Sequence, residues 1–195
     1  MTLIVQKNTP ILRKKAREVH LPDIGGKKLT DTLTRMREAL AGESDGVAIA
    51  APQIGVSLRV FIVWEPALSL SEDVLERRAK MERRRQDDRY LVFINPVITK
   101  RSREQALLEE GCLSVRWFYG KVRRAKRATI VAYDETGKRF TRGSSGILAQ
   151  IFQHEADHLD GVLFIDKATD VQEILPQDTE HTSQSTDHET PNTKN

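Results

Sequence analysis

Several features that define other classes of protein are missing from this chain of 195 residues. It has one cysteine, Cys112, so no disulfide can form within the chain, which is typical of a reducing compartment. No apolar run approaches the roughly 18 residues of a membrane span. The N-terminus lacks the basic and then apolar pattern of a secretion signal. We therefore expect a cytoplasmic protein with no membrane partner.

The net charge is also small, at +3, although 30% of the residues are charged. With 38% hydrophobic residues, the chain can form one packed domain and is short for two. We expect that single domain over residues 1–170. A charged stretch at about 65–89 is expected to be an insertion, as an exposed helix or a mobile loop. Residues 171–195 are rich in polar side chains and are expected to form a disordered tail.

Acidic residues are absent from one basic stretch, residues 116–127, which has three aromatic residues near its start. Basic residues beside aromatic ones can bind nucleic acid, by pairing with phosphates and stacking on bases. A solvated pair of strands explains the same pattern and is the simpler interpretation. No feature of the sequence indicates a specific DNA site.

Two of the five histidines stand close together in the pattern H-E-x-x-H, at His154 and His158. The apolar residues before them repeat at helical spacing: Ile147, Leu148, Ile151, Phe152. On a helix the two imidazoles lie one turn apart on the same face and can hold one metal ion. Glu155, one step round the helix, can then reach a water on that ion. Chance would produce this pattern in about one chain in a hundred of this composition.

A catalytic metal site of this kind needs a third protein ligand and an open position for water. From the residues alone, His20, Cys112 and many carboxylates remain candidates. Cys112 is the sharpest of them, because it follows a glycine that can turn the chain. A bound ion would also keep its thiol deprotonated.

Two further stretches join this helix to form a set of three ordered motifs. Residues 46–53 read Gly-Val-Ala-Ile-Ala-Ala-Pro-Gln, residues 110–114 read Glu-Gly-Cys-Leu-Ser, and residues 153–158 read Gln-His-Glu-Ala-Asp-His. In this order they resemble the motifs of the peptide deformylase family, and lesser similarities extend from about residue 3 to 168. The resemblance implies an α+β fold, in which antiparallel sheets pack around a central helix that carries the metal site.

By this resemblance the metal ligands are Cys112, His154 and His158. The family's ion is usually Fe²⁺, with Zn²⁺, Ni²⁺ or Co²⁺ as alternatives, and cysteine with histidine suits several of these ions. The implied reaction removes the formyl group from N-formylmethionine and releases formate. The implied substrate is the N-formylmethionyl nascent peptide, and ribosome contact through a basic surface would bring enzyme and substrate together.

The resemblance also assigns roles to single residues. Glu155 would take a proton from the attacking water and pass it to the departing amine. The Gln53 side-chain amide and the Leu113 backbone N–H would stabilise the oxyanion. The peptide would lie beside Val47 and Ala48 as an added strand, with its methionine side chain in a pocket near Val47 and Leu113.

Residues around these ligands are expected to orient them. Glu110 and Asp157 are the candidates, and Arg124 could pair with Asp157; ordinary surface salt bridges are the alternative.

Three features depart from the family pattern. Ala48 replaces the second glycine of the first motif and adds a methyl group beside the formyl site. Arg116 stands where many members have proline, and Tyr119 stands near the position of an arginine that helps to hold the peptide. The tail has no basic helix of the kind that some members use to dock on ribosomes.

Two other functions fit the same residues. An amidase or peptidase with this metal site could act on a different acyl group because of Ala48. A non-enzymatic relative could bind ribosomal RNA or a nascent chain. The intact metal ligands and Glu155 argue against this second alternative.

Overall fold

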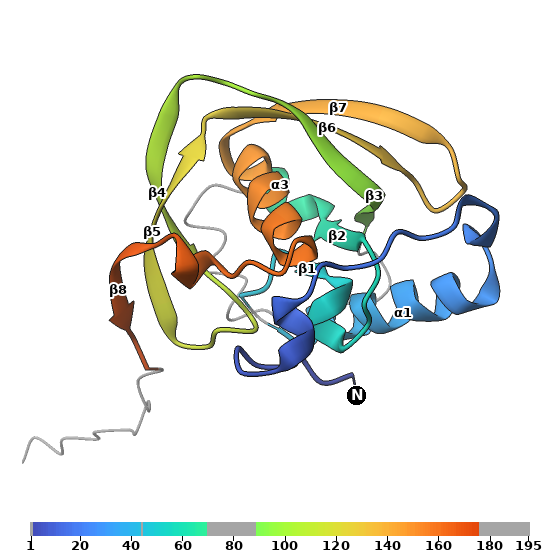
Figure 1. Cartoon of the computed structure of the whole chain (residues 1–195), viewed down its shortest axis with the longest axis horizontal. Helices are drawn as coiled ribbons and strands as arrows, with labels where there is room; N and C mark the ends of the chain where they lie inside the picture. Colours follow the sequence, from blue (N-terminus) through green and yellow to red (C-terminus); the bar gives the residue numbers. More distant parts are fainter. Residues whose placement is uncertain (1, 44, 70–88, 176–195) are drawn as a thin grey trace, which may run out of the picture.

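Two antiparallel sheets surround one central helix, α3, in the computed structural model (Figure 1). The structure describes residues 2–43, 45–69 and 89–175. The larger sheet has the order β1-β2-β3-β6-β7, with β1 at Ala48–Ala50, β2 at Val60–Trp64, β3 at Tyr90–Arg101, β6 at Arg127–Tyr133 and β7 at Arg139–Ser145. The smaller sheet has the order β4-β5-β8, with β4 at Gln105–Gly111, β5 at Phe118–Ala125 and β8 at Thr169–Glu173. Helix α3 spans Gly146–Leu159.

Strand β2 is buried along its whole length because helices cover both faces of its sheet. Alternate side chains of a strand point to opposite faces. Val60 and Ile62 pack in a cluster with helix α1, Lys27–Ala41, whereas Phe61 and Val63 pack in a second cluster with α3. The uninterrupted apolar run of this strand is therefore a consequence of its central place between two helices.

Aromatic packing fixes α3 against the larger sheet. The rings of Phe61 and Phe93 stack with centroids 4.5 Å apart, and Phe152 of α3 meets Phe93 edge to face at 5.3 Å. The helix ends at Leu159, and Gly161 just beyond it has a φ of 77°, the left-handed conformation that favours glycine. A Cβ atom there would lie 2.8 Å from the backbone of Arg13, so the turn also needs glycine for space.

The N-terminal segment crosses the end of this helix (Figure 1). It contains the short 3-10 helices η1, Pro10–Arg13, and η2, Leu21–Asp23. The backbone N–H of Ala16 donates to the carbonyl of Leu159 at 2.9 Å. The Asn95 side chain exchanges two hydrogen bonds with the backbone of Val19, at 2.8 and 2.7 Å. These contacts attach the first part of the chain to both the helix and the sheet.

The predicted fold class is confirmed, since antiparallel sheets pack around a central helix that carries the H-E-x-x-H motif. Strand β8 continues to Glu173, past the predicted start of the tail at 171. Residues 176–195 of that tail lie outside the described residues. In the predicted insertion, Glu65–Ser69 forms the 3-10 helix η4, and residues 70–88 are likewise outside the described part. None of the described helices has the length and apolar character that crossing a membrane requires.

Candidate metal centre

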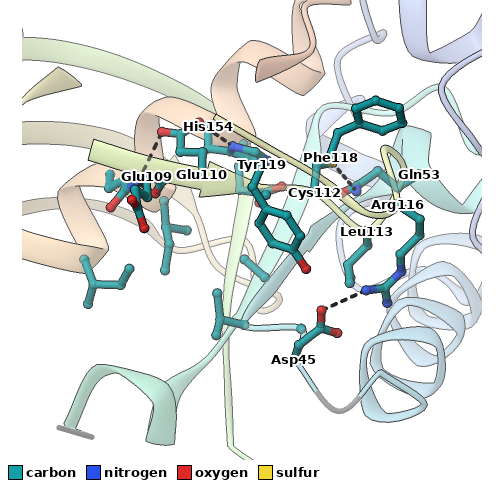
Figure 2. Close-up of a pocket in the computed structure, with 18 of the residues that line it drawn as sticks. Asp45, Gln53, Glu109, Glu110, Cys112, Leu113, Arg116, Phe118, Tyr119 and His154 are labelled. Atoms are coloured by element: carbon teal, nitrogen blue, oxygen red, sulfur yellow. Dashed lines mark hydrogen bonds and ion pairs between the residues drawn. The ribbon is translucent and has the colours of Figure 1, made fainter. Parts of the chain in front are cut away.

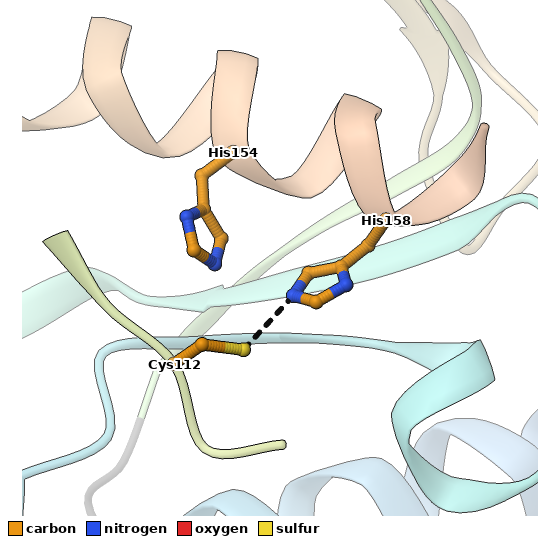
Figure 3. Close-up of side chains that lie close together, drawn as sticks. All are labelled: Cys112, His154 and His158. Atoms are coloured by element: carbon orange, nitrogen blue, oxygen red, sulfur yellow. Dashed lines mark hydrogen bonds between the residues drawn. The ribbon is translucent and has the colours of Figure 1, made fainter. Parts of the chain in front are cut away.

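The three predicted metal ligands meet between α3 and the end of β4 (Figure 3). His154 and His158 project from the same side of the helix, as residues four apart must. Cys112 follows Gly111, the last residue of β4, and points at them. One ligand atom from each residue lies within 4.8 Å of the others, and Nε2 of His158 is 3.2 Å from Sγ of Cys112. His20, the other histidine candidate, lines a separate groove with Val97 and Tyr133.

A buried carboxylate orients the first of these histidines. Nδ1 of His154 lies 2.9 Å from a carboxylate oxygen of Glu110. An ionised carboxylate can only accept, so Nδ1 of His154 donates to Glu110, and Nε2 is the nitrogen that can bind a metal. The expected role of Glu110 in orienting a ligand is therefore matched by a direct contact.

Arg124 holds Glu110 in place. It donates two hydrogen bonds to Glu110, at 2.7 and 2.8 Å, and a third to Asp157 at 2.6 Å. The expected pairing of Arg124 with Asp157 is present, and Lys167 binds the other oxygen of Asp157 at 2.7 Å. Burial alone would raise the pKa of Glu110, but the hydrogen bonds from Arg124 and His154 outweigh it and lower the pKa to about 2. Glu110 is therefore ionised at neutral pH.

Hydrogen-bond donors also surround the thiol of Cys112. Burial would raise its pKa, but the neighbouring His158 and His154 outweigh burial and lower the pKa to about 5. The backbone N–H of Ser114 lies 3.4 Å from Sγ and points at it. The site therefore favours the thiolate, which is the form of cysteine that binds metals.

Glu155 is buried beside the two histidines, with 3% of its surface exposed. Burial raises the pKa of its carboxyl group, against the lowering effect of His154 and His158. Among the described residues, neither its Oε2 nor Nδ1 of His158 has a hydrogen-bond partner. A buried polar atom without a partner costs free energy unless a ligand or water satisfies it. The unpaired carboxylate oxygen, together with one thiolate and two imidazoles, fits a divalent transition metal with a water.

Gln53 also lies beside the thiol of Cys112 and belongs to the 3-10 helix η3 at Ala51–Ile54. Its Oε1 accepts a hydrogen bond from the backbone N–H of Ala50 at 2.8 Å. This contact turns the NH₂ group toward the site, where it lies 3.2 Å from Oγ of Ser114 and 3.6 Å from Sγ of Cys112. The side chain is 2% exposed, so its orientation is held by the surrounding protein.

A cavity of about 410 Å³ opens beside the cluster (Figure 2). Each residue predicted to bind substrate lines it: Val47, Ala48, Gln53 and Leu113. Cys112, His154 and Glu155 line it too, so the predicted catalytic and substrate-binding residues share one cavity.

Arg116 is a cavity residue whose role the sequence does not reveal. Its guanidinium pairs with Glu43 and, at 2.8 Å, with Asp45, which joins the segment after Cys112 to the segment before β1. Figure 2 shows the ion pair between Arg116 and Asp45 at the side of the cavity. Its position in a basic stretch suggested a surface role. The one sequence feature that indicates a place near the site is that Arg116 comes two residues after the Glu-Gly-Cys-Leu-Ser motif.

Comparison with known proteins identifies one family. The family model described as polypeptide deformylase matches residues 1–173. Peptide deformylase 1A of Arabidopsis thaliana, chloroplastic/mitochondrial, is 40% identical over 164 residues, which span 84% of this chain and 60% of that protein. Peptide deformylase of Desulforudis audaxviator is 38% identical over 171 residues, or 86% of this chain and 94% of that protein. The crystal structure of the Thermotoga maritima peptide deformylase superposes with a TM-score of 0.69 at 32% identity, covering 87% of this chain and 98% of that one.

Proposed function

The chain belongs to the peptide deformylase family of metal-dependent hydrolases, and we propose that its Cys112, His154 and His158 hold the catalytic ion. The reaction of this family is hydrolysis of the N-formyl group on the N-terminal methionine of new proteins. The observation that carries the residue assignment is the buried Oε2 of Glu155, unpaired among the described residues and beside the three ligands. A water in the site would satisfy this oxygen and stand ready for attack.

We propose Fe²⁺ as the ion in the cell, with Zn²⁺, Ni²⁺ or Co²⁺ able to replace it. One thiolate and two imidazoles suit each of these ions. When bound, such an ion polarises a carbonyl and makes water a stronger nucleophile near neutral pH. Glu110 contributes by keeping His154 in the tautomer that presents Nε2 to the site.

Glu155 acts as the acid and base in this proposal. Its Oε2 accepts a proton from the attacking water while the new bond to the formyl carbon forms. It then returns the proton to the amine nitrogen as the carbon–nitrogen bond breaks, which releases formate and a free N-terminal methionine. The raised pKa of this carboxyl group supports the role, because a more basic carboxylate accepts a proton more readily.

Gln53 and Leu113 stabilise the oxyanion that forms between these two steps. The Gln53 amide is held with its NH₂ group toward Cys112. The Leu113 N–H belongs to the peptide unit whose carbonyl, that of Cys112, accepts a hydrogen bond from Val115 at 3.0 Å. Donors held in place before reaction need no reorganisation when negative charge develops, which is why they lower the barrier.

The substrate peptide binds along β1. This strand is at one end of the larger sheet, and among the described strands it pairs with β2 alone. Its other edge can accept an extended peptide through backbone hydrogen bonds, beside Val47 and Ala48. The methionine side chain then enters the apolar part of the cavity, next to Leu113 and Ile151.

We propose the ribosome as a further partner. Two turns lie side by side, since the N–H of Ser102 donates to the carbonyl of Arg127 and that of Lys126 donates to Glu104. Five exposed basic side chains surround them: Lys100, Arg101, Arg103, Lys126, Arg127. Lys126 pairs with Glu104 at 2.7 Å, so the other four supply most of the positive charge. Such a surface suits the phosphates of ribosomal RNA in the cytoplasm. Salt-dependent co-sedimentation with ribosomes that weakens in an Arg101→Glu, Arg103→Glu variant would support it, and unchanged binding would contradict it.

An anaerobic assay of formate release, with metal analysis of the same sample, tests the proposed function. Anaerobic handling protects the thiolate ligand from oxidation. Formyl-methionine peptides should be hydrolysed and acetyl-methionine peptides should be poor substrates. Equal or faster release of acetate would favour a different amidase. Absence of both products from metal-loaded protein would favour a non-enzymatic relative.

A further inference from the structure

Three consecutive residues near the N-terminus each contact a different residue of the active-site cavity. The backbone N–H of Val5 donates to the carbonyl of Gln53 at 2.9 Å. The side-chain amide of Gln6 donates to the carbonyl of Leu113 at 3.2 Å. Nζ of Lys7 lies 3.7 Å from the centre of the Phe118 ring, within the range of a cation–π contact. The three contacted residues, Gln53, Leu113 and Phe118, all line the cavity (Figure 2).

The arm that carries these residues is itself anchored. Ile4 packs against the cluster that contains α1, and Val5 packs against a third cluster with Val115. On the other side, the N–H of Thr9 donates to the carbonyl of Gln6 at 2.8 Å, and η1 follows with a fully buried Leu12. Residues 5–7 are therefore held from both ends while they contact the cavity.

The two residues joined by this arm come from different parts of the fold. Gln53 follows β1 of the larger sheet, and Leu113 follows β4 of the smaller sheet. A hydrogen bond from Gln53 to Ser114 at 3.2 Å links these segments on the cavity side. Val5 and Gln6 link the two segments a second time, because they donate to the backbone carbonyls of Gln53 and Leu113.

We propose that residues 5–7 form an N-terminal strap that sets the spacing of the two oxyanion donors, the Gln53 amide and the Leu113 N–H. This proposal rests on the function proposed above, which places both donors on one oxygen atom of the substrate. Gln6 and Lys7 are positioning residues that touch no reacting atom. Misplacement of catalytic groups by as little as about 1 Å can cost on the order of 100-fold in rate, so weak contacts outside the cavity affect turnover.

Gln6→Ala and Lys7→Met test the strap in the metal-loaded full chain. The kcat of each for a formyl-methionine peptide should fall by roughly 3–10-fold, while KM changes by less than about 2-fold, because the lost stabilisation belongs to the transition state. Lys7→Arg, which keeps the cation–π contact, should restore kcat. Asn8→Ala and Lys15→Met are matched controls, since both residues are exposed on the same segment and neither is among the described residues that line the cavity. Metal content and melting temperature should match those of the controls.

A double-mutant cycle with Gln53→Ala separates positioning from folding. If the strap acts by aligning the two donors, Gln6→Ala should have little further effect once the Gln53 amide is absent. Full additivity of the two losses would overturn the proposal. It would also be overturned if kcat of Gln6→Ala and Lys7→Met equals that of the controls. The same holds if the loss of kcat in each variant is proportional to its loss of melting temperature. Absence of formate release from wild type would instead contradict the proposed function.

Discussion

Glu110 and Arg124 form a two-bond ion pair that is almost completely removed from solvent, with side-chain exposures of 3% and 4%. Burial alone would lower the pKa of Arg124, but Glu110 and Asp157 outweigh it and raise the pKa. The pair connects strands β4 and β5 of the smaller sheet to His154 on the central helix. It therefore joins the folding of the domain to the orientation of His154, a proposed metal ligand.

Replacing this arginine should unfold the domain readily. Arg124→Met leaves Glu110 buried without its main partner, and removal of one member of a buried pair typically costs about 3–5 kcal/mol. Urea denaturation measures the loss. Arg123→Met, on the exposed face of the same strand, is the matched control and should change stability by less than about 0.5 kcal/mol. Similar losses in both variants would contradict the importance of the buried pair.

The same pair predicts a pH dependence of stability. The pKa of Glu110 is about 2 in the folded protein and 4.5 in the reference state. Because the folded-state pKa is lower, ionised Glu110 contributes its full stabilisation above pH 4.5 and loses it as the pH falls toward 2. The difference in free energy of unfolding between wild type and Glu110→Gln, measured without metal, should therefore shrink over this range. A constant difference from pH 7 to pH 2 would rule out this explanation.

Removal of the proposed base should separate chemistry from metal binding. Glu155→Ala keeps Cys112, His154 and His158, so the metal content should stay at the wild-type level. Loss of a general base should reduce kcat by about 100-fold or more. Elemental analysis and formate release are measured on one sample, with exposed Glu38→Gln as the control. Turnover within a few-fold of wild type would refute the assigned role.

Ala48 should control how well the formyl group fits. It is 8% exposed, lines the cavity and packs in the cluster that contains α3. Ala48→Gly should raise kcat/KM for formyl-methionine peptides up to about 10-fold if the methyl group crowds the substrate, which corresponds to about 1.4 kcal/mol of transition-state stabilisation. The variant should lose about 0.5–1 kcal/mol of stability, since glycine gains more freedom on unfolding. An unchanged or lower kcat/KM would show that this methyl group does not limit the reaction.

Metal removal should abolish activity reversibly. A chelator should stop formate release and lower the melting temperature, because an ion that binds only the folded state stabilises it. Anaerobic addition of Fe²⁺ or Co²⁺ should restore both properties. Cys112→Ser should need a higher metal concentration for the same recovery, since a hydroxyl is a weaker ligand than a thiolate for these ions. Full activity in metal-depleted protein would contradict the proposed centre.

Much of the site can be predicted from local sequence. His154 and His158 share a helix face because of their spacing, and Glu155 follows from the same helix. The third ligand is different in kind. Chemistry alone left His20 open. The family resemblance implied Cys112, and the fold places Cys112 beside the two histidines although it lies far along the chain from the helix.

The basic stretch 116–127 shows what local sequence could not decide. Its six basic residues look alike in the sequence, yet Arg124 is buried with Glu110, Arg116 pairs with Asp45 beside the cavity, and Arg127 is exposed. Strand alternation and the partners brought by other strands separate them. The sequence shows which residues are charged, but the tertiary structure decides which partner each charged residue has.

The sequence by itself determined the types of the proposed ligands, the helix that presents two of them and the α+β class. Tertiary structure alone decided that Arg124 supports Glu110, that Arg116 joins two sides of the cavity, and that the arm at residues 5–7 contacts Gln53 and Leu113. The physical reason is distance along the chain. Helical spacing acts over four residues, but these contacts exist only after β1 and β4 of different sheets have packed around α3.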